Sequence, residues 1–123
     1  MEQKGLRGSA PARIDDKGRL KVPTVFRGVI HDQQGPDVFV TSVTGESVRI
    51  YPLATCLEIE RKLLQMARNH PARLKFLDRV NYYGLTGELD TQGRVVIPPH
   101  LRESASIVGD VRVFGRIDYL EVW

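Results

Sequence analysis

The sequence has few of the features that mark secreted, membrane-spanning or disulfide-bonded proteins. Its 123 residues include one cysteine, Cys56, so no disulfide can form within the chain, as is typical of proteins that stay in a reducing cytoplasm. No apolar run approaches the roughly 20 residues of a membrane-spanning helix, and the N-terminus lacks the apolar segment of a secretory signal. We therefore expect a cytoplasmic chain with no membrane partner.

Signatures of catalysis and of metal binding are also missing. The three histidines lie far apart, and none has metal-ligand spacing to the cysteine or to another histidine. The sequence contains no glycine-rich phosphate loop and no nucleophile elbow. This pattern indicates a protein that is not an enzyme and that has no metal, no cofactor and no small-molecule substrate.

What the sequence does contain is an internal repeat. The segment Ile14–Pro23 (IDDKGRLKVP) returns as Leu89–Pro98 (LDTQGRVVIP), at an offset of 75 residues. The alignment pairs Asp15 with Asp90, Gly18 with Gly93, Arg19 with Arg94, Phe26 with Leu101 and Arg27 with Arg102. Because internal repetition outranks local signals when a fold is inferred, the chain is interpreted as two copies of one unit of roughly 35 to 40 residues.

Each copy is predicted to be strand, strand, short helix, strand, strand. In the first copy, two alternating stretches flank Asp15–Gly18, where Asp suits the first position of a type I turn and Gly supplies a positive φ. The alternation places Ile14, Leu20 and Val22 on one face of this hairpin and Arg13, Arg19 and Lys21 on the other. Helices are predicted over residues 24–30 and 99–105, and further strands over 38–43 and 47–51. Two such halves can close on each other around one core.

A two-stranded ribbon with a basic face fits the major groove of DNA, and arginine suits bidentate contact with guanine or with phosphate. The alternative is that Asp15 and Arg19 pair with each other across the turn and serve only to shape it.

The net charge of +3 is unevenly distributed. Residues 1–27 carry seven basic and three acidic side chains and residues 54–79 carry six and three, whereas residues 28–53 and 80–123 each have a net charge of −2. Such concentration is expected where a surface meets a polyanion, although a solvated face gives the same pattern.

We predict four parts along the chain: a flexible basic arm over residues 1–11, a first repeat over 12–53, a helical linker over 54–84 and a second repeat over 85–123. A loose basic arm often reaches DNA phosphates or the minor groove, but a terminus without a role is equally consistent. The linker shows helical periodicity over 54–69 and 72–80, separated by His70-Pro71. Its helices could pack on the barrel, on a neighbouring subunit or on both.

The duplicated L/I-D-x-x-G-R-x-x-x-P motif on either side of a basic helical insert resembles the MraZ family of bacterial transcriptional regulators, within the SpoVT-AbrB superfamily. Arg61-Lys62-Leu63 and the closing Leu120–Trp123 extend the resemblance over nearly the whole chain. It implies an α+β fold, in which two swapped-hairpin halves form an AbrB-like β-barrel with a helical insert. It also implies a nucleoid-associated, sequence-specific DNA-binding repressor of the division and cell-wall gene cluster, which binds promoter direct repeats as a ring-shaped homo-oligomer.

Carried over residue by residue, the resemblance makes Arg19 the main DNA-contacting side chain. Its expected supporting residues are Arg13, Lys17, Lys21 and Arg7, with Arg94 as the counterpart in the second repeat. Because Gln92 and Val96 replace Lys17 and Lys21 there, the second hairpin is expected to contribute less to DNA binding. Asp15, Gly18, Asp90 and Gly93 are expected to shape the two turns. An AbrB-like antitoxin or protein-interaction module is the alternative, although such chains usually carry one hairpin unit and a disordered tail.

Overall fold

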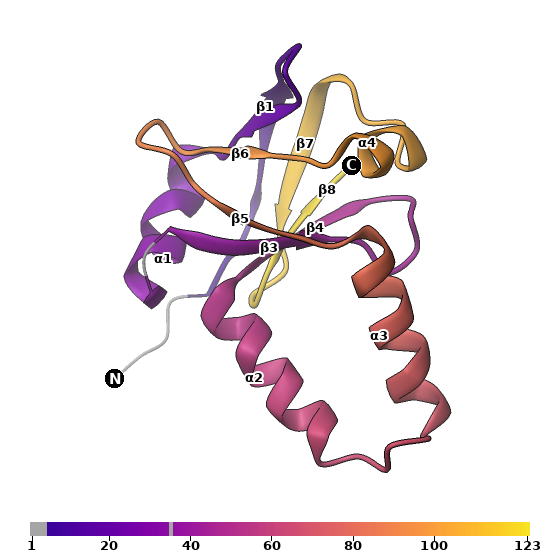
Figure 1. The fold of residues 1–123 in the computed structure, drawn as a ribbon. Coiled ribbons are helices and arrows are strands. Elements are labelled where there is room, and N and C mark those ends of the chain that lie inside the picture. The colour runs from indigo at the N-terminus through magenta and orange to yellow at the C-terminus, as the bar shows by residue number, and fades with distance from the viewer. Residues whose placement is uncertain (1–4, 35) are drawn as a thin grey trace.

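The structure, a computed structural model, describes residues 5–34 and 36–123 of the chain. The elements, labelled in Figure 1, are β1 (Ser9–Ile14), β2 (Arg19–Lys21), α1 (Thr24–Gln34), β3 (Asp37–Thr41), β4 (Val48–Pro52), α2 (Leu53–Leu64), α3 (Pro71–Tyr83), β5 (Leu85–Glu88), β6 (Arg94–Val96), α4 (Pro99–Ser104), β7 (Gly109–Gly115) and β8 (Leu120–Val122). The predicted order of elements is therefore found in both repeats. Between the predicted helix over residues 24–30 and the predicted strand over 38–43, Gly35-Pro36 was expected to lie in a loop, and Gly35 lies outside the described residues.

The strands form one antiparallel sheet in the order β5-β3-β4-β8-β7-β1-β2-β6, curled into a nearly closed barrel. Most of its ladders join the two repeats: β1 pairs with β7, β2 with β6, β3 with β5 and β4 with β8. Each hairpin thus completes the sheet of the other repeat. This confirms the predicted α+β fold and its swapped-hairpin barrel.

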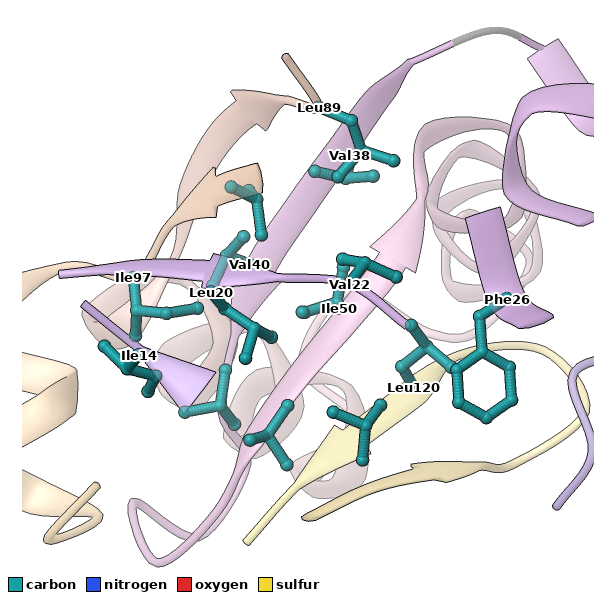
Figure 2. Close-up of a cluster of buried hydrophobic side chains, with 14 of the residues drawn as sticks. Ile14, Leu20, Val22, Phe26, Val38, Val40, Ile50, Leu89, Ile97 and Leu120 are labelled. Atoms are coloured by element: carbon teal, nitrogen blue, oxygen red, sulfur yellow. The ribbon is translucent and has the colours of Figure 1, made fainter. Parts of the chain in front are cut away.

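The core lies inside the barrel and is shared by the two repeats (Figure 2). Val22 and Phe26 of the first repeat are buried, as are their equivalents Ile97 and Leu101 of the second. Equivalent positions of the two copies therefore meet in one interior. Burying apolar side chains is the main favourable term in folding, so neither half has this core without the other.

The beginning of the chain differs from the sequence prediction. Leu6 is fully buried, and its N–H donates to the Ile117 carbonyl at 3.0 Å while the Ile117 N–H donates to the Leu6 carbonyl at 2.7 Å. Strand β1 begins at Ser9 and pairs with β7 along its whole length. The prediction of a flexible arm is therefore wrong for residues 6–11, and residues 1–4 lie outside the described residues. An unpaired edge of β7 captures this segment, and that partner is about 100 residues away in sequence.

The linker forms two helices that project as a V from the side of the barrel opposite the β1–β2 turn (Figure 1). Helix α2 has no buried side chain, and α3 has one, Val80. The Thr41 hydroxyl donates to the Val80 carbonyl at 2.7 Å and fixes the end of α3 to the sheet. The linker therefore contacts the barrel mainly at the start of α2 and the end of α3, and the loop that joins the two helices lies far from the barrel (Figure 1). Among the described residues, no helix is long and apolar enough to cross a membrane.

The first linker helix is shorter than the predicted 54–69. After Leu64 the N–H groups of Gln65 and Met66 bond three residues back, to the carbonyls of Lys62 and Leu63, which tightens the last turn. The Arg73 guanidinium then donates to the Met66 carbonyl at 2.9 Å. These contacts end α2 early, although the apolar periodicity continues.

Candidate nucleic-acid interface

The turn between β1 and β2 is built around the Asp15 carboxylate. One carboxylate oxygen accepts the backbone N–H groups of Lys17 at 3.0 Å and Arg19 at 2.8 Å, and the other accepts Nε of Arg19 at 2.8 Å. The Gly18 N–H closes the turn on the Asp15 carbonyl, with φ of +80° at Gly18. Asp15 and Arg19 thus pair across the turn, as the alternative interpretation expected. The pairing occupies Nε and not the two terminal nitrogens of Arg19.

The turn between β5 and β6 repeats this arrangement bond for bond. Asp90 accepts the N–H groups of Gln92 at 2.9 Å and Arg94 at 2.8 Å, and it accepts Nε of Arg94 at 2.9 Å. Gly93 has φ of +75° and donates to the Asp90 carbonyl. The D-x-x-G-R motif therefore encodes one rigid turn, used twice.

These hydrogen bonds lower the pKa of both carboxyl groups. The backbone N–H of Arg19 has the largest lowering effect on the pKa of Asp15, and the backbone N–H of Arg94 does the same for Asp90. Because the folded pKa lies below the ordinary value of 3.8, each carboxylate stabilises the fold above that pH. The contribution is lost as the pH falls below 3.8 and through the folded pKa.

Each turn is also braced by an arginine from the other repeat. Arg102 of α4 lies against Gly18, where an added Cβ would come within 2.5 Å of its guanidinium carbon, and its Nε donates to the Ile97 carbonyl at 3.0 Å. Arg27 of α1 lies in the same way against Gly93. Neither arginine had an expected role from the sequence, although the repeat pairs Arg27 with Arg102, and that pairing was the available signal.

The ladder between β2 and β6 brings the two hairpins together. Arg19 lies opposite Val96, and Lys21 lies opposite Arg94, while the intervening Leu20 and Val95 are buried. Side chains alternate between the faces of a sheet, so Arg19, Lys21 and Arg94 share the outer face. Their neighbour Val96 is 49% exposed on the same face. The structure thus places Arg94 beside the first hairpin.

The other predicted site residues are distributed more widely. Lys17 is exposed at the tip of the first turn, and Arg13 is exposed on β1, where it pairs with Asp110 of β7 at 2.9 Å. Arg7 precedes β1 and lies at its opposite end, about 20 Å from Arg13 at the usual rise of a strand. The structure therefore gathers Arg13, Lys17, Arg19, Lys21 and Arg94 near the β1–β2 and β2–β6 pairs, but not Arg7.

The gathered groups are suited to electrostatic binding. Arginine and lysine carry only hydrogen-bond donors and a permanent positive charge, the chemistry that recognises phosphate and the acceptor atoms of guanine. Among the residues that the structure describes, no three His, Cys, Asp or Glu side chains lie together in a group that could hold a metal ion.

A duplicated barrel of swapped hairpins, with an Asp–Arg turn in each copy, defines an AbrB-like protein.

Residues 86–123 match a family model described as "MraZ protein, putative antitoxin-like". The chain is 53% identical over 117 residues to a protein of Acidobacterium capsulatum named transcriptional regulator MraZ, covering 95% of this chain and 80% of that relative. It is 48% identical over 118 residues to the protein of that name from Koribacter versatilis, covering 95% and 80%, respectively. A third relative of that name, from Syntrophobacter fumaroxidans, is 35% identical over 118 residues, covering 96% of this chain and 78% of the relative. The chain belongs to the MraZ family, as the resemblance implied.

Proposed function

We propose that this chain is a transcriptional regulator that binds duplex DNA through its β1–β2 hairpin. In this proposal it represses the division and cell-wall gene cluster from direct repeats in the promoter, and it acts in the cytoplasm on the nucleoid. The names of its relatives support a role in transcription. The cationic outer face of the β2–β6 ladder supports DNA as the partner.

The observation that carries the proposal is the fixed position of Arg19. Asp15 holds Nε of Arg19 at 2.8 Å, and the turn that carries both residues is closed by backbone hydrogen bonds. A side chain that is already ordered loses less entropy when it binds, so a paired Arg19 is a better contact than a free one. Turn shaping and DNA contact are therefore compatible roles of one side chain.

Arg19→Ala tests the proposal, with Arg94→Ala as the matched control. Both variants lose the same Asp–Arg pair in the same kind of turn, so they have equivalent structural effects. Binding to duplex DNA from upstream of the chain's own operon is measured at several salt concentrations. We expect Arg19→Ala to weaken binding by roughly tenfold or more and, where a phosphate contact is lost, to lower the salt slope by about one. Arg94→Ala is expected to weaken it less. Unchanged affinity in a folded Arg19→Ala protein would contradict the proposal.

We also propose that the chain assembles into a ring-shaped homo-oligomer. The support is the linker, whose α2 has no fully buried side chain and leaves Leu57 and Leu64 exposed by 47% and 70%. A helix with an uncovered apolar stripe is typical of an interface. In a ring, many weak hairpin contacts act on repeated DNA sites together, and affinity rises through effective concentration.

An antitoxin-like interaction module is the second candidate, and the wording of the family description favours it. In that case a partner protein, rather than DNA alone, would be required for the chain to act. Promoter repression by the purified chain in a transcription assay without any partner would exclude this candidate.

A further inference from the structure

A shallow hollow lies beside the first hairpin, between β1, the end of β2 and the start of α1. Its volume is about 480 Å³, and its charged lining consists of three cations and one carboxylate: Arg13, Lys21, Arg27 and Asp110. Nε of Arg27 is held by the Val22 carbonyl at 2.8 Å, whereas Lys21 is exposed. The arrangement is suited to an anion the size of a phosphate group.

One of the three cations is already engaged by the carboxylate. Arg13 and Asp110 are opposite each other on β1 and β7, which run side by side (Figure 1), and their side chains pair at 2.9 Å. Both side chains are highly exposed, at 71% and 89%, so this pair is of the weak surface kind. An incoming phosphate would compete with Asp110 for the same guanidinium.

The equivalent position in the second repeat has the opposite charge. The repeat alignment matches Arg13 to Glu88, Lys21 to Val96 and Asp110 to Asp37. Glu88 and Asp37 lie opposite each other on β5 and β3, as Arg13 and Asp110 do on β1 and β7. Two carboxylates thus stand where the first repeat has one carboxylate and a guanidinium. The positive charge of the hollow beside the first hairpin is therefore particular to the first repeat and does not follow from the duplicated fold.

We propose that this hollow binds one backbone phosphate of the DNA and that Asp110 weakens this contact by holding Arg13 in the free protein. The inference rests on the proposed function, because the phosphate is taken to belong to DNA read by the adjacent turn. It adds a site, its ligand and a competing carboxylate to that function. It also provides a reason for the two hairpins to differ in their contribution, since Glu88 and Asp37 would repel a phosphate.

Asp110→Asn tests the proposal, with Asp37→Asn as the control. Both substitutions remove one exposed carboxylate at equivalent positions, so they change the net charge equally. We expect Asp110→Asn to tighten binding to the promoter duplex by about two- to fivefold and to steepen the salt slope by up to about one, because Arg13 is freed for phosphate. Asp37→Asn is expected to change the affinity by less than about twofold, because only the distant net charge changes. Adding Lys21→Gln to Asp110→Asn is expected to reduce the gain. Equal gains from Asp110→Asn and Asp37→Asn, or weaker binding by Asp110→Asn, would overturn the proposal.

A titration with inorganic phosphate separates this inference from the proposed function. Amide NMR shifts of Arg13 and Thr24 are followed at constant ionic strength, with chloride as the balancing anion. We expect saturable shifts there, at lower phosphate concentration in Asp110→Asn than in the wild type. No shift in either protein would overturn the hollow as a phosphate site, even if the chain binds DNA. Phosphate binding without any binding to duplex DNA would contradict the proposed function and the assignment of the phosphate to DNA.

Discussion

At the scale of single residues, Gly18 of the first motif is a glycine for two separate reasons. Gly18 has φ of +80°, a conformation that costs an L-residue about 1–2 kcal/mol. It also lies against the guanidinium of Arg102, which an added Cβ would have to displace. The repeat alignment could predict the turn, but the arginine behind it comes from the other repeat and could not be foreseen from local sequence.

Gly18→Ala is therefore expected to lower the free energy of unfolding by about 1 to 3 kcal/mol, measured by urea titration. The control is Gly28→Ala in α1, where an added Cβ meets nothing within 4 Å. There the substitution is expected to raise stability by about 0.5 to 1 kcal/mol, because alanine favours the helix. A Gly18→Ala protein as stable as the wild type would show that neither the backbone conformation nor Arg102 constrains the turn.

At the scale of elements, β1 shows where reasoning from the sequence reached its limit. The alternation on either side of Asp15 predicted the hairpin, and the buried positions Ile14, Leu20 and Val22 confirm it. Gly5, Gly8 and Pro11 suggested a loose arm before it. That segment pairs with β7, which lies about 100 residues later in the sequence, so no local pattern could reveal the pairing.

Leu6→Ala tests the assignment of this segment to the barrel. Because Leu6 is fully buried, we expect the substitution to cost about 2 to 5 kcal/mol of unfolding free energy in a urea titration. The neighbouring Arg7→Ala is expected to change stability by less than about 0.5 kcal/mol, because Arg7 is exposed. If both variants were equally stable, residues 6–11 would behave as the free arm that the sequence suggested.

At the scale of the whole molecule, the swapped ladders explain why the repeat was informative. Once two copies of a unit with an apolar face are recognised, one shared core follows, and the buried pairs Val22 with Ile97 and Phe26 with Leu101 fit that expectation. The linker was harder to predict. Its apolar stripe is similar whether the helices cover the barrel or a second subunit, and only the structure showed that α2 has no fully buried side chain within its own chain and leaves Leu57 and Leu64 exposed.

The exposed side chains of the linker predict how the proposed homo-oligomer should respond to mutation. Leu57→Lys combined with Leu64→Lys is expected to produce a smaller species in sedimentation velocity, because charge would replace the proposed apolar contact between subunits. The far-UV circular dichroism should be unchanged, since neither side chain is buried in the monomer. Val108→Lys, at a side chain that is 82% exposed outside the linker, is the control and should keep the wild-type mass. An unchanged mass in the double variant would remove the linker as the site of assembly.

The charge difference between equivalent positions of the two repeats gives the molecule a direction. A dimer of identical single-hairpin chains has a true two-fold axis and therefore suits palindromic half-sites. Here the axis relates the backbones of the repeats but not their charges, because Arg13 and Lys21 correspond to Glu88 and Val96. Under the proposed function, such a subunit would lie on the duplex in one orientation only. Copies arranged with the same polarity would then match sites in the same orientation rather than inverted sites.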